Sequence, residues 1–285
     1  MQEISEHVFI EHTYPGVVLG AINWPHGLIL IDAPFRPDDV RSWRSALLNL
    51  GGGVDRMLIN LDVHADRTLG ARLMECTVVG HEMMSKVFRN RPITFKAQGS
   101  ETGAEWETYN GLGSVRWAPP EITFTSTMHI YWDSTPLVLE YHPGPAAGSI
   151  WAVIPDQKVA FVGDAVIVNQ PPYLIGADIP AWLDTLKILT GKEYQNYLLV
   201  NGRNGLISHK HVSQQIDFLM RVQTCIDPLV AAKGNPEDTA AFVPDLLKWI
   251  EFPAERRQQY TNRLKYGLMH YFIRHYRSSG ELLDE

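Results

Sequence analysis

The residues of this chain best suited to chemistry gather at positions 62–67, where aspartate and histidine alternate. Asp62, His64 and Asp66 follow an apolar run at residues 57–59 that has the character of a buried strand, and Arg67 comes directly after them. Imidazole and carboxylate groups at this short spacing, just after a strand, are typical of metal ligands. Taken alone, such residues are more often ordinary polar groups of a loop. Arg67 does not fit a metal site, because arginine is permanently charged and has no acceptor atom.

The composition predicts a chain that builds its own core and does not bind polyanions. With 285 residues, 45% of them hydrophobic, the chain can form one large α/β domain or two small ones. A formal net charge of −7 and scattered Lys and Arg predict that nucleic acid is not a partner. Cys76 and Cys225 fit neither a disulfide framework nor a zinc finger, so we expect free thiols. No signal-peptide pattern and no apolar run of about 20 residues is found, which predicts a cytoplasmic protein without a membrane partner.

Short apolar runs and helical patterns alternate along the chain, which predicts layers of sheet and helix around these residues. Strands are expected at residues 8–12, 16–23, 27–32, 55–64, 77–80, 122–127, 128–132, 137–142, 149–155, 158–166 and 197–202. Helices are expected at residues 36–53, 65–76, 81–88, 180–189, 211–232, 242–252 and 254–276, with a short one at residues 104–109. The chain has no flexible linker and no repeat, so we expect residues 1–212 to form the main domain and residues 213–285 to be helices packed on it.

Five stretches resemble, in order, motifs of the metallo-β-lactamase superfamily. GLILIDAPF at residues 27–35 is similar to the strand that ends in Leu-Ile-Asp, with Asp32 at the matching position, and LINLDVHADRTLG at residues 58–70 is similar to the His-x-His-x-Asp-His loop. HPGPAAGS at residues 142–149 resembles the Pro-Gly-His loop, AFVGDAV at residues 160–166 the Gly-Asp strand end, and VNGRNGLIS at residues 200–208 the Pro-Gly-His-Gly loop. The resemblance implies an α/β fold, the metallo-β-lactamase-like αββα sandwich, with additional C-terminal helices. It also implies hydrolase activity at a metal pair held at one edge of the sandwich.

A comparison by position shows that the family's ligand set is only partly kept. His64, Asp66 and Asp164 match three of the seven ligand positions, and Asp164 stands where the family's metal-bridging aspartate lies. The remaining four positions hold other residues: Asp62 and Arg67 in the first motif, Pro145 in the second and Arg203 in the last. Proline has no lone pair to offer a metal, and two guanidiniums would repel one.

These replacements predict that the dinuclear metal site is lost. We expect Arg67 and Arg203 to form ion pairs with Asp62, Asp66 and Asp164 in place of metal, with no cofactor. Such a protein would be an inactive or unusual hydrolase homologue that binds a small molecule or a partner in the old cleft. The alternative is a hydrolase of an ester, lactone, thioester or phosphodiester that uses one Mn, Fe or Zn ion held by Asp62, His64, Asp66 and Asp164. A third possibility is metal-free acid–base catalysis by His64 beside Asp66.

Further residues are candidates for ligands, pocket walls or contacts. His209, His211, His142 and His81 are candidates to replace a missing ligand, although ordinary structural roles are the more common case. Tyr173 and Trp182 lie in or next to the loop after Asp164, where the family often builds a substrate-facing wall, so we expect them to line a pocket. Residues at helical spacing near the end of the chain are expected to pack on the domain, or alternatively to form a homodimer contact: Tyr260, Leu264, Leu268, Tyr271 and Phe272.

Overall fold

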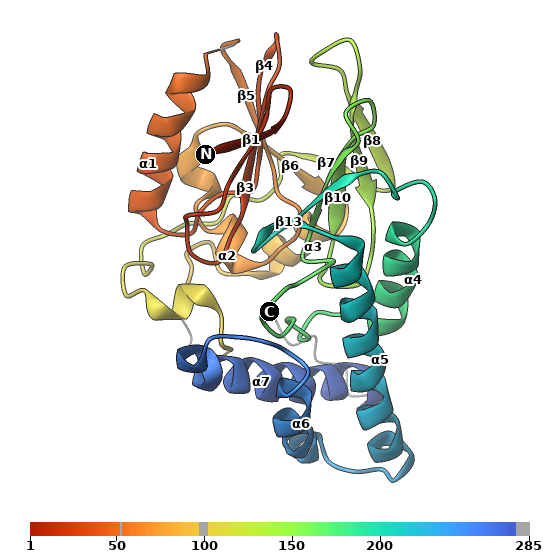
Figure 1. Ribbon diagram of the computed structural model, residues 1–285. Helices are drawn as coiled ribbons and strands as arrows, with labels where there is room; N and C mark the ends of the chain where they lie inside the picture. The colour runs from red at the N-terminus through yellow and green to blue at the C-terminus, as the bar shows by residue number, and fades with distance from the viewer. Residues whose placement is uncertain (52, 97–101, 278–285) are drawn as a thin grey trace.

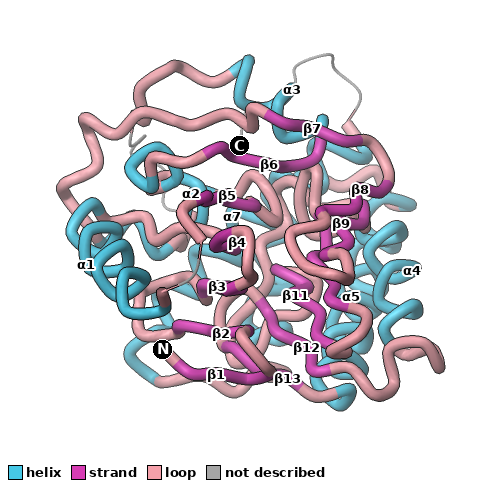
Figure 2. The backbone as a smooth tube through the Cα atoms, turned by 90° about the horizontal axis from the view of Figure 1, so that it is seen from above, coloured by secondary structure: helices cyan, strands magenta, loops and turns pink. Residues whose placement is uncertain are grey.

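Two β-sheets face each other and helices cover their outer faces in the computed structural model, which describes residues 1–51, 53–96 and 102–277 (Figures 1 and 2). Within these residues, the first sheet has seven strands in the order β1-β2-β3-β4-β5-β6-β7, and the second has six in the order β13-β12-β11-β10-β9-β8. Their bounds are β1 Gln2–Ser5, β2 Val8–Glu11, β3 Leu19–Asn23, β4 Gly27–Ile31, β5 Asp55–Ile59, β6 Thr77–His81, β7 Ile122–Phe124, β8 Thr127–Ile130, β9 Leu137–Tyr141, β10 Ile150–Ile154, β11 Val159–Gly163, β12 Leu198–Asn201 and β13 Gly205–Ile207. The predicted αββα sandwich is confirmed.

The order of strand directions brings several strand ends to one edge of the sandwich. Strands β1 to β4 form an antiparallel meander, after which β4, β5, β6 and β7 run parallel. In the second sheet β11 and β12 run parallel, and the other neighbouring strands are antiparallel. Parallel strands need a crossover connection, and α1 (Pro37–Leu47) supplies it between β4 and β5. The loops that follow β4, β5, β11 and β12 carry the predicted site residues.

Helices complete both outer layers. Helices α1, α2 (Ala65–Thr68) and α3 (Glu82–Asn90) accompany the first sheet, and α4 (Ile179–Leu189), α5 (His209–Ala231), α6 (Val243–Leu247) and α7 (Arg257–Tyr276) accompany the second (Figure 1). Short 3-10 helices occur at η1 Leu48–Leu50, η2 Ala71–Met74, η3 Glu105–Thr108, η4 Pro236–Phe242 and η5 Ala254–Arg256. Val40, Trp43 and Leu47 of α1 are buried against the first sheet, as their helical spacing predicts.

The C-terminal helices pack on the same body as the second sheet. Helix α5 begins at His209 and therefore runs across residue 212, and it shares a core with α4, α6 and α7. The five residues considered for a homodimer contact are all buried in that core: Tyr260, Leu264, Leu268, Tyr271 and Phe272. Their side chains are consequently not available for a contact with a second copy.

Several predicted elements differ from the structure. The single helix expected at residues 65–76 is divided into α2 and η2, and Gly70 lies between them so close to the Pro34 carbonyl that a Cβ there would lie 1.9 Å from its oxygen. The strand expected at residues 122–127 is also divided, since β7 pairs with the first sheet and β8 with the second. Strands β1 and β13 were not predicted, and the helix expected at residues 242–252 is only the short α6.

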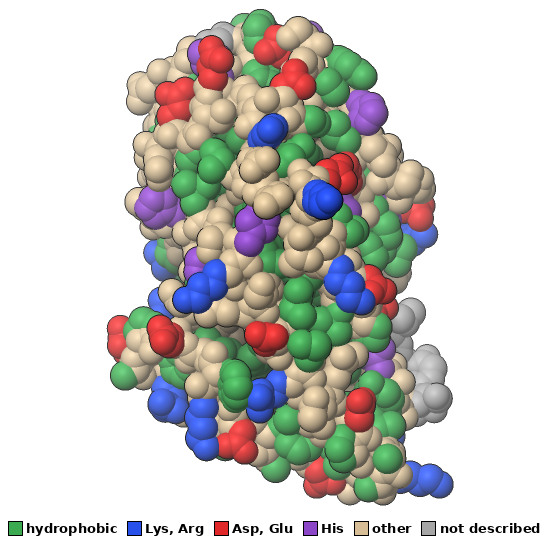
Figure 3. All heavy atoms as spheres, turned by 45° about the vertical axis from the view of Figure 1, so that its right-hand side comes forward, with side chains coloured by type: hydrophobic (Ala, Val, Ile, Leu, Met, Phe, Trp, Pro, Cys, Tyr) green, Lys and Arg blue, Asp and Glu red, His purple; other side chains and the backbone are tan. Residues whose placement is uncertain are grey.

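The face of the molecule seen in Figure 3 mixes charged side chains of both signs. On the face seen in Figure 3, Lys and Arg lie among Asp and Glu rather than in one patch. Across the described residues, no helix combines the length and the hydropathy needed to cross a bilayer. Cys76 and Cys225 are both free thiols.

Candidate functional site

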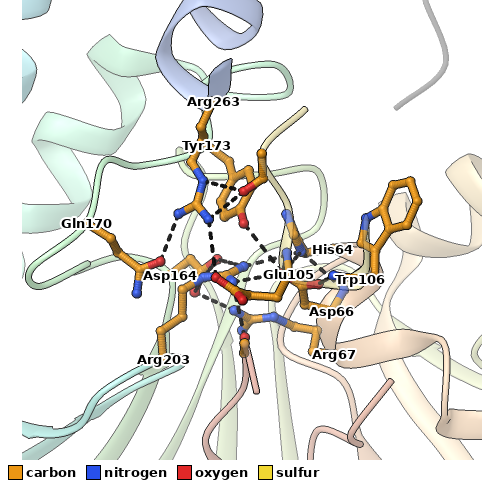
Figure 4. A network of polar contacts seen from close by, with 12 residues as sticks. His64, Asp66, Arg67, Glu105, Trp106, Asp164, Gln170, Tyr173, Arg203 and Arg263 are labelled. Carbon is orange, nitrogen blue, oxygen red and sulfur yellow. Dashed lines mark hydrogen bonds and ion pairs between the residues drawn. The ribbon is translucent and has the colours of Figure 1, made fainter. Parts of the chain in front are cut away.

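The predicted site residues meet where strands of both sheets end (Figure 4). In the first sheet, Asp32 follows β4 and residues 62–67 follow β5; in the second, Asp164 follows β11 and Arg203 follows β12. Because β4 pairs in parallel with β5, and β11 with β12, each pair ends at a common edge. Asp32 adopts the left-handed conformation, with φ of 60°, which aspartate tolerates better than most residues.

Arg67 is fully buried among three carboxyl groups. Its Nη1 lies 3.2 Å from Asp32 Oδ2, its Nε lies 3.2 Å from Asp62 Oδ1, and its Nη2 forms an ion pair with Asp164. The contact with Asp62 is an ion pair without hydrogen-bond geometry, whereas the other two are also hydrogen bonds. Gly202 leaves the necessary space, since a Cβ there would lie 2.6 Å from Arg67 Nη2 and 2.8 Å from Asp164 Oδ1.

Arg203 holds the other side of the cluster. Its Nη2 donates to Asp164 Oδ2 at 2.8 Å, and its Nε–H lies between the two Asp164 oxygens, 3.0 Å from Oδ2 and 3.2 Å from Oδ1, so the guanidinium engages both oxygens. Its Nη1 donates to Asp66 Oδ2 at 3.0 Å and to the Gly16 carbonyl at 3.1 Å. Its Nη2 also lies 3.2 Å from His64 Nδ1. The two arginines together therefore contact every aspartate of the predicted set.

His64 is fixed in one tautomer by its neighbours. Its Nδ1 caps α2 by accepting from the Asp66 backbone N–H at 3.3 Å, and it faces the Arg203 guanidinium as well. Both of those groups can only donate, so Nδ1 is the acceptor and the proton of the neutral ring sits on Nε2. Burial and the nearby Arg203 charge hold the pKa of His64 well below its usual range. The Tyr173 ring lies beside it, with centroids 4.1 Å apart.

The carboxyl groups differ in how firmly they hold a charge. Burial raises the pKa of Asp32 to about 7, although Arg67 opposes the rise. Burial likewise raises the pKa of Asp62 and Asp66. For Asp164 the effect of burial is outweighed by Arg203 and Arg67, and its pKa lies below the usual range. Asp164 is thus the carboxylate most firmly held by the two guanidiniums.

A second group of residues attaches the C-terminal helix α7 to this cluster. The Tyr173 ring contacts two guanidiniums, with Arg203 Cζ 4.5 Å and Arg263 Cζ 4.0 Å from its centroid, and its hydroxyl lies 3.4 Å from Asp66 Oδ2. Arg263, from α7, is fully buried and donates to the Gly103 carbonyl at 2.7 and 3.0 Å. Helix α7 therefore helps, through Arg263, to hold the Tyr173 ring beside His64.

Segment η3 contributes through its backbone and through Glu105. The backbone N–H groups of Trp106 and Glu105 lie 2.9 and 3.4 Å from Asp66 carboxylate oxygens. The Glu105 carboxylate accepts from Arg256 at 3.0 Å and from Gln259 at 3.0 Å, and both donors precede or belong to α7. Glu105 and Arg263 were not predicted from the sequence. Arg263 had a signal, because it stands on the apolar stripe of α7, where a charged residue needs a buried partner.

A cavity of about 260 Å³ opens beside His64 and Asp164. Tyr173 and Trp182 both line it, and so does Pro145. Most of its other walls are apolar or aromatic and include Phe95, Trp106, Trp117, Ile167 and Ile175. Trp182 is held in place by a hydrogen bond from its Nε1 to the Ala165 carbonyl at 2.8 Å.

The four histidines considered as replacement ligands have other partners. His81 Nε2 lies 2.8 Å from the Thr125 carbonyl, and His142 Nε2 lies 3.0 Å from Glu140. His209 Nε2 lies 3.2 Å from the Gln195 carbonyl, and His211 caps α5 at Ser208. In the part of the chain that the structure describes, no group of three or more His, Cys, Asp or Glu side chains is arranged to hold a metal ion.

Comparison with known proteins identifies the fold. The family model described as the metallo-beta-lactamase superfamily matches residues 77–199, a segment that contains Pro145 and Asp164 but not the 62–67 motif or Arg203. No match is found among curated proteins.

Solved structures of this fold superpose on most of the chain. A metallo-beta-lactamase family protein from Thermus thermophilus is 14% identical and has a TM-score of 0.64, with 94% of this chain and 93% of that chain covered. A metallo-beta-lactamase from Pontibacter korlensis is 18% identical with a TM-score of 0.59, covering 77% and 97%. The sec-alkylsulfatase Pisa1 from Pseudomonas sp. is 15% identical with a TM-score of 0.62, covering 96% of this chain and 49% of that chain. At these identities the likeness concerns the fold.

Proposed function

We propose that this chain, which has the metallo-β-lactamase fold and matches the model of that superfamily over residues 77–199, is a metal-independent member that binds a small molecule in the cleft beside Asp164. In this proposal Arg67 and Arg203 take over the neutralising role of the metal pair. The observation that carries it is the pairing of both guanidiniums with Asp164, the residue at the metal-bridging position.

Electrostatics explains why the two arginines and a metal pair exclude each other. Arginine stays protonated and has no acceptor atom, so it cannot become a ligand. Two unit charges about 4 Å apart interact by about 4 kcal/mol at an effective dielectric constant near 20, and a divalent ion doubles the repulsion from each guanidinium. A metal would also have to take carboxylate oxygens that Arg203 already holds at 2.8 and 3.0 Å. The residues present therefore do not fit a dinuclear metal centre.

The alternative uses of His64 find less support in the geometry. For acid–base catalysis with Asp66, the imidazole would have to donate its Nδ1 proton to that carboxylate. The Nδ1 atom instead faces the Arg203 guanidinium at 3.2 Å and lies 3.6 Å from Asp66 Oδ2. The low pKa of His64 further weakens it as a base. For a single metal ion, Asp62, Asp66 and Asp164 would each have to give up an arginine contact.

The cavity supports a binding role. Its walls are mainly apolar and aromatic and a few polar groups face it, which is the usual composition of a site for a small molecule. Its volume of about 260 Å³ lies slightly below the roughly 300–1,000 Å³ of typical ligand sites, so the occupant is expected to be small.

Metal analysis tests the proposal. Protein purified without chelator, and protein equilibrated with zinc or manganese and then dialysed, should hold less than one ion per chain. A matched variant that carries Asp62→His, Arg67→His, Pro145→His and Arg203→His should gain zinc if the positions are aligned correctly. About two zinc ions per wild-type chain would overturn the proposal. A single manganese or iron ion that is lost in Asp164→Asn, together with ester or phosphodiester turnover, would establish the mono-metal alternative instead.

A further inference from the structure

The polar group of His64 that remains open to the cavity is its Nε2–H. The Nδ1 atom is used by the Asp66 backbone N–H and by Arg203, both of which donate, so the ring proton is on Nε2. His64 is itself one of the residues that line the cavity. The imidazole therefore offers the cavity a hydrogen-bond donor in a fixed orientation.

Asp164, which lines the same cavity, is already saturated. Its Oδ1 accepts from Arg67 Nη2 and from Arg203 Nε, and its Oδ2 accepts from Arg203 Nε and Nη2. The single N–H of Arg203 Nε is shared between the two oxygens, so three N–H groups make these four contacts and both oxygens are engaged. Among the described lining residues Asp164 is the only carboxylate. A ligand that approaches His64 thus meets one donor and no vacant acceptor on Asp164.

The walls of the cavity are mainly apolar and aromatic. Phe95, Trp106, Trp117, Tyr173, Trp182 and Ile175 line it, and the polar side chains of Arg91, Thr94, Lys96, Thr102, Tyr266 and His270 line it as well. Aromatic side chains of this kind bury large areas and prefer offset or edge contacts with another ring. A polar group placed against these walls without a partner would lose its hydration, which costs free energy.

We propose that the cavity binds a small aromatic or branched apolar molecule whose one polar group is an uncharged oxygen, such as a ketone, that accepts a hydrogen bond from His64 Nε2–H. This inference rests on the proposed metal-independent binding function. A carboxylate beside Asp164 would need Arg91 or Lys96, the two cations among the described lining residues, as its counter-charge, and an ammonium would find no vacant acceptor on Asp164. The uncharged acceptor is the group that this arrangement satisfies.

A matched pair of probes tests the ligand class by isothermal titration calorimetry. The probes are 2-acetylnaphthalene, which carries a carbonyl, and 2-isopropenylnaphthalene, in which a CH₂ group replaces the carbonyl oxygen. The ketone should bind the wild-type protein at least roughly three- to tenfold more tightly. In the ketone complex His64 Nε2–H is hydrogen-bonded, whereas in the alkene complex the same buried N–H has no partner. Binding of the alkene as tightly as the ketone, or more tightly, would overturn the inference.

Two variants then locate the donor. In His64→Asn the side-chain oxygen can still accept from Arg203 and from the Asp66 backbone, but the Nε2–H is gone, so the preference for the ketone should disappear while the alkene still binds. His26→Asn alters an exposed histidine outside the cavity and should keep the preference. Equal preference in wild type and His64→Asn would overturn the role of His64.

The remaining outcomes separate this inference from the proposal on which it rests. If 2-naphthoate binds more tightly than the ketone, the ligand group is anionic and the inference is wrong, although the cleft still binds small molecules. If none of the three probes binds, the inference on the ligand class is wrong, and the metal analysis still decides the proposed function. If zinc fills the site in the metal analysis, the proposed function fails whichever probe is preferred.

Discussion

Replacing Arg67 by methionine tests whether the guanidinium network supports the fold. Methionine keeps much of the side-chain volume but leaves Asp32, Asp62 and Asp164 without their shared buried cation. Removal of one partner from a buried ion pair typically costs about 3–5 kcal/mol. Two features reduce the cost here: Asp164 keeps Arg203, and Asp32, with a pKa of about 7, readily takes up a proton. We therefore expect a loss of about 3 kcal/mol at neutral pH, out of a total stability of roughly 5–15 kcal/mol.

The loss should grow as the pH rises. Without Arg67, the pKa values of Asp32 and Asp62 in the folded state move further above that of an unfolded aspartate, because the attraction that opposed their burial is gone. The folded variant then binds more protons than its unfolded chain, and stability falls with rising pH wherever that is so. The difference between wild type and Arg67→Met should consequently be larger at pH 8 than at pH 5.

Urea denaturation followed by tryptophan fluorescence measures both effects. Arg41→Met is the matched control, because Arg41 is 72% exposed and pairs only at the surface with Asp38, so its loss should be small at either pH. An Arg67→Met variant no less stable than Arg41→Met would refute the view that the guanidinium is a structural replacement for metal. If the stability difference between wild type and Arg67→Met shrinks at higher pH, the loss does not come from the unpaired carboxylates of Asp32 and Asp62.

Three further outcomes follow from the same geometry. Burial raises the pKa of Asp32 to about 7 from 3.8, so the folded state holds a proton that the unfolded chain releases. Wild-type stability should therefore fall between about pH 4 and pH 7, and Asp32→Asn should lack that contribution; identical pH profiles of unfolding free energy would contradict this. Gly202→Ala would force a Cβ within 2.6 Å of Arg67 and should lower the denaturation midpoint, whereas Gly113→Ala, with no atom within 4 Å of its Cβ, should not; equal midpoints would argue against close packing here. Arg263→Met should cost about 1–3 kcal/mol in denaturation experiments because the buried Gly103 carbonyl keeps only its Gln259 donor and the Pro171 carbonyl loses the Arg263 donor, and an unchanged midpoint would contradict that role.

Local patterns were enough to predict most strands and helices, and the resemblance to a known family implied the sandwich, but neither predicted the places where tertiary contacts decide the structure. The strands at 27–32 and 158–166 were recognisable because β-branched runs end at turn residues, and α1 because its apolar spacing is helical. The edge strands β1 and β13 are short and partly exposed, so no alternating pattern marks them. The division at residues 125–126 depends on which sheet each half pairs with. That choice is not encoded in local periodicity.

Site residues that belong to a sequence motif could be predicted, whereas those held only by tertiary contacts could not. The ordered motifs identified Asp62, His64, Asp66, Arg67, Asp164 and Arg203, and the structure places all six together. Arg263 and Glu105 escaped notice because neither belongs to a motif and their partners lie far along the chain. Glu105 is hydrogen-bonded to Arg256, which is 151 positions away in the sequence, and Arg263 to Gly103, which is 160 positions away. Contacts at such separations follow only from the three-dimensional arrangement of η3 and α7.

The retained carboxylates do not by themselves indicate a metal. In the proposed site, Asp66 and Asp164 are required by the two buried arginines as much as the arginines are required by them, because removing either partner leaves an uncompensated charge in the interior. Matching acidic positions would therefore persist in a chain that binds no ion. The residues that distinguish the two cases are those facing the carboxylates: neutral imidazoles leave room for a cation, whereas Arg67 and Arg203 supply one permanently. For this reason the expected chemistry of the cleft follows from positions 67 and 203 more than from positions 66 and 164.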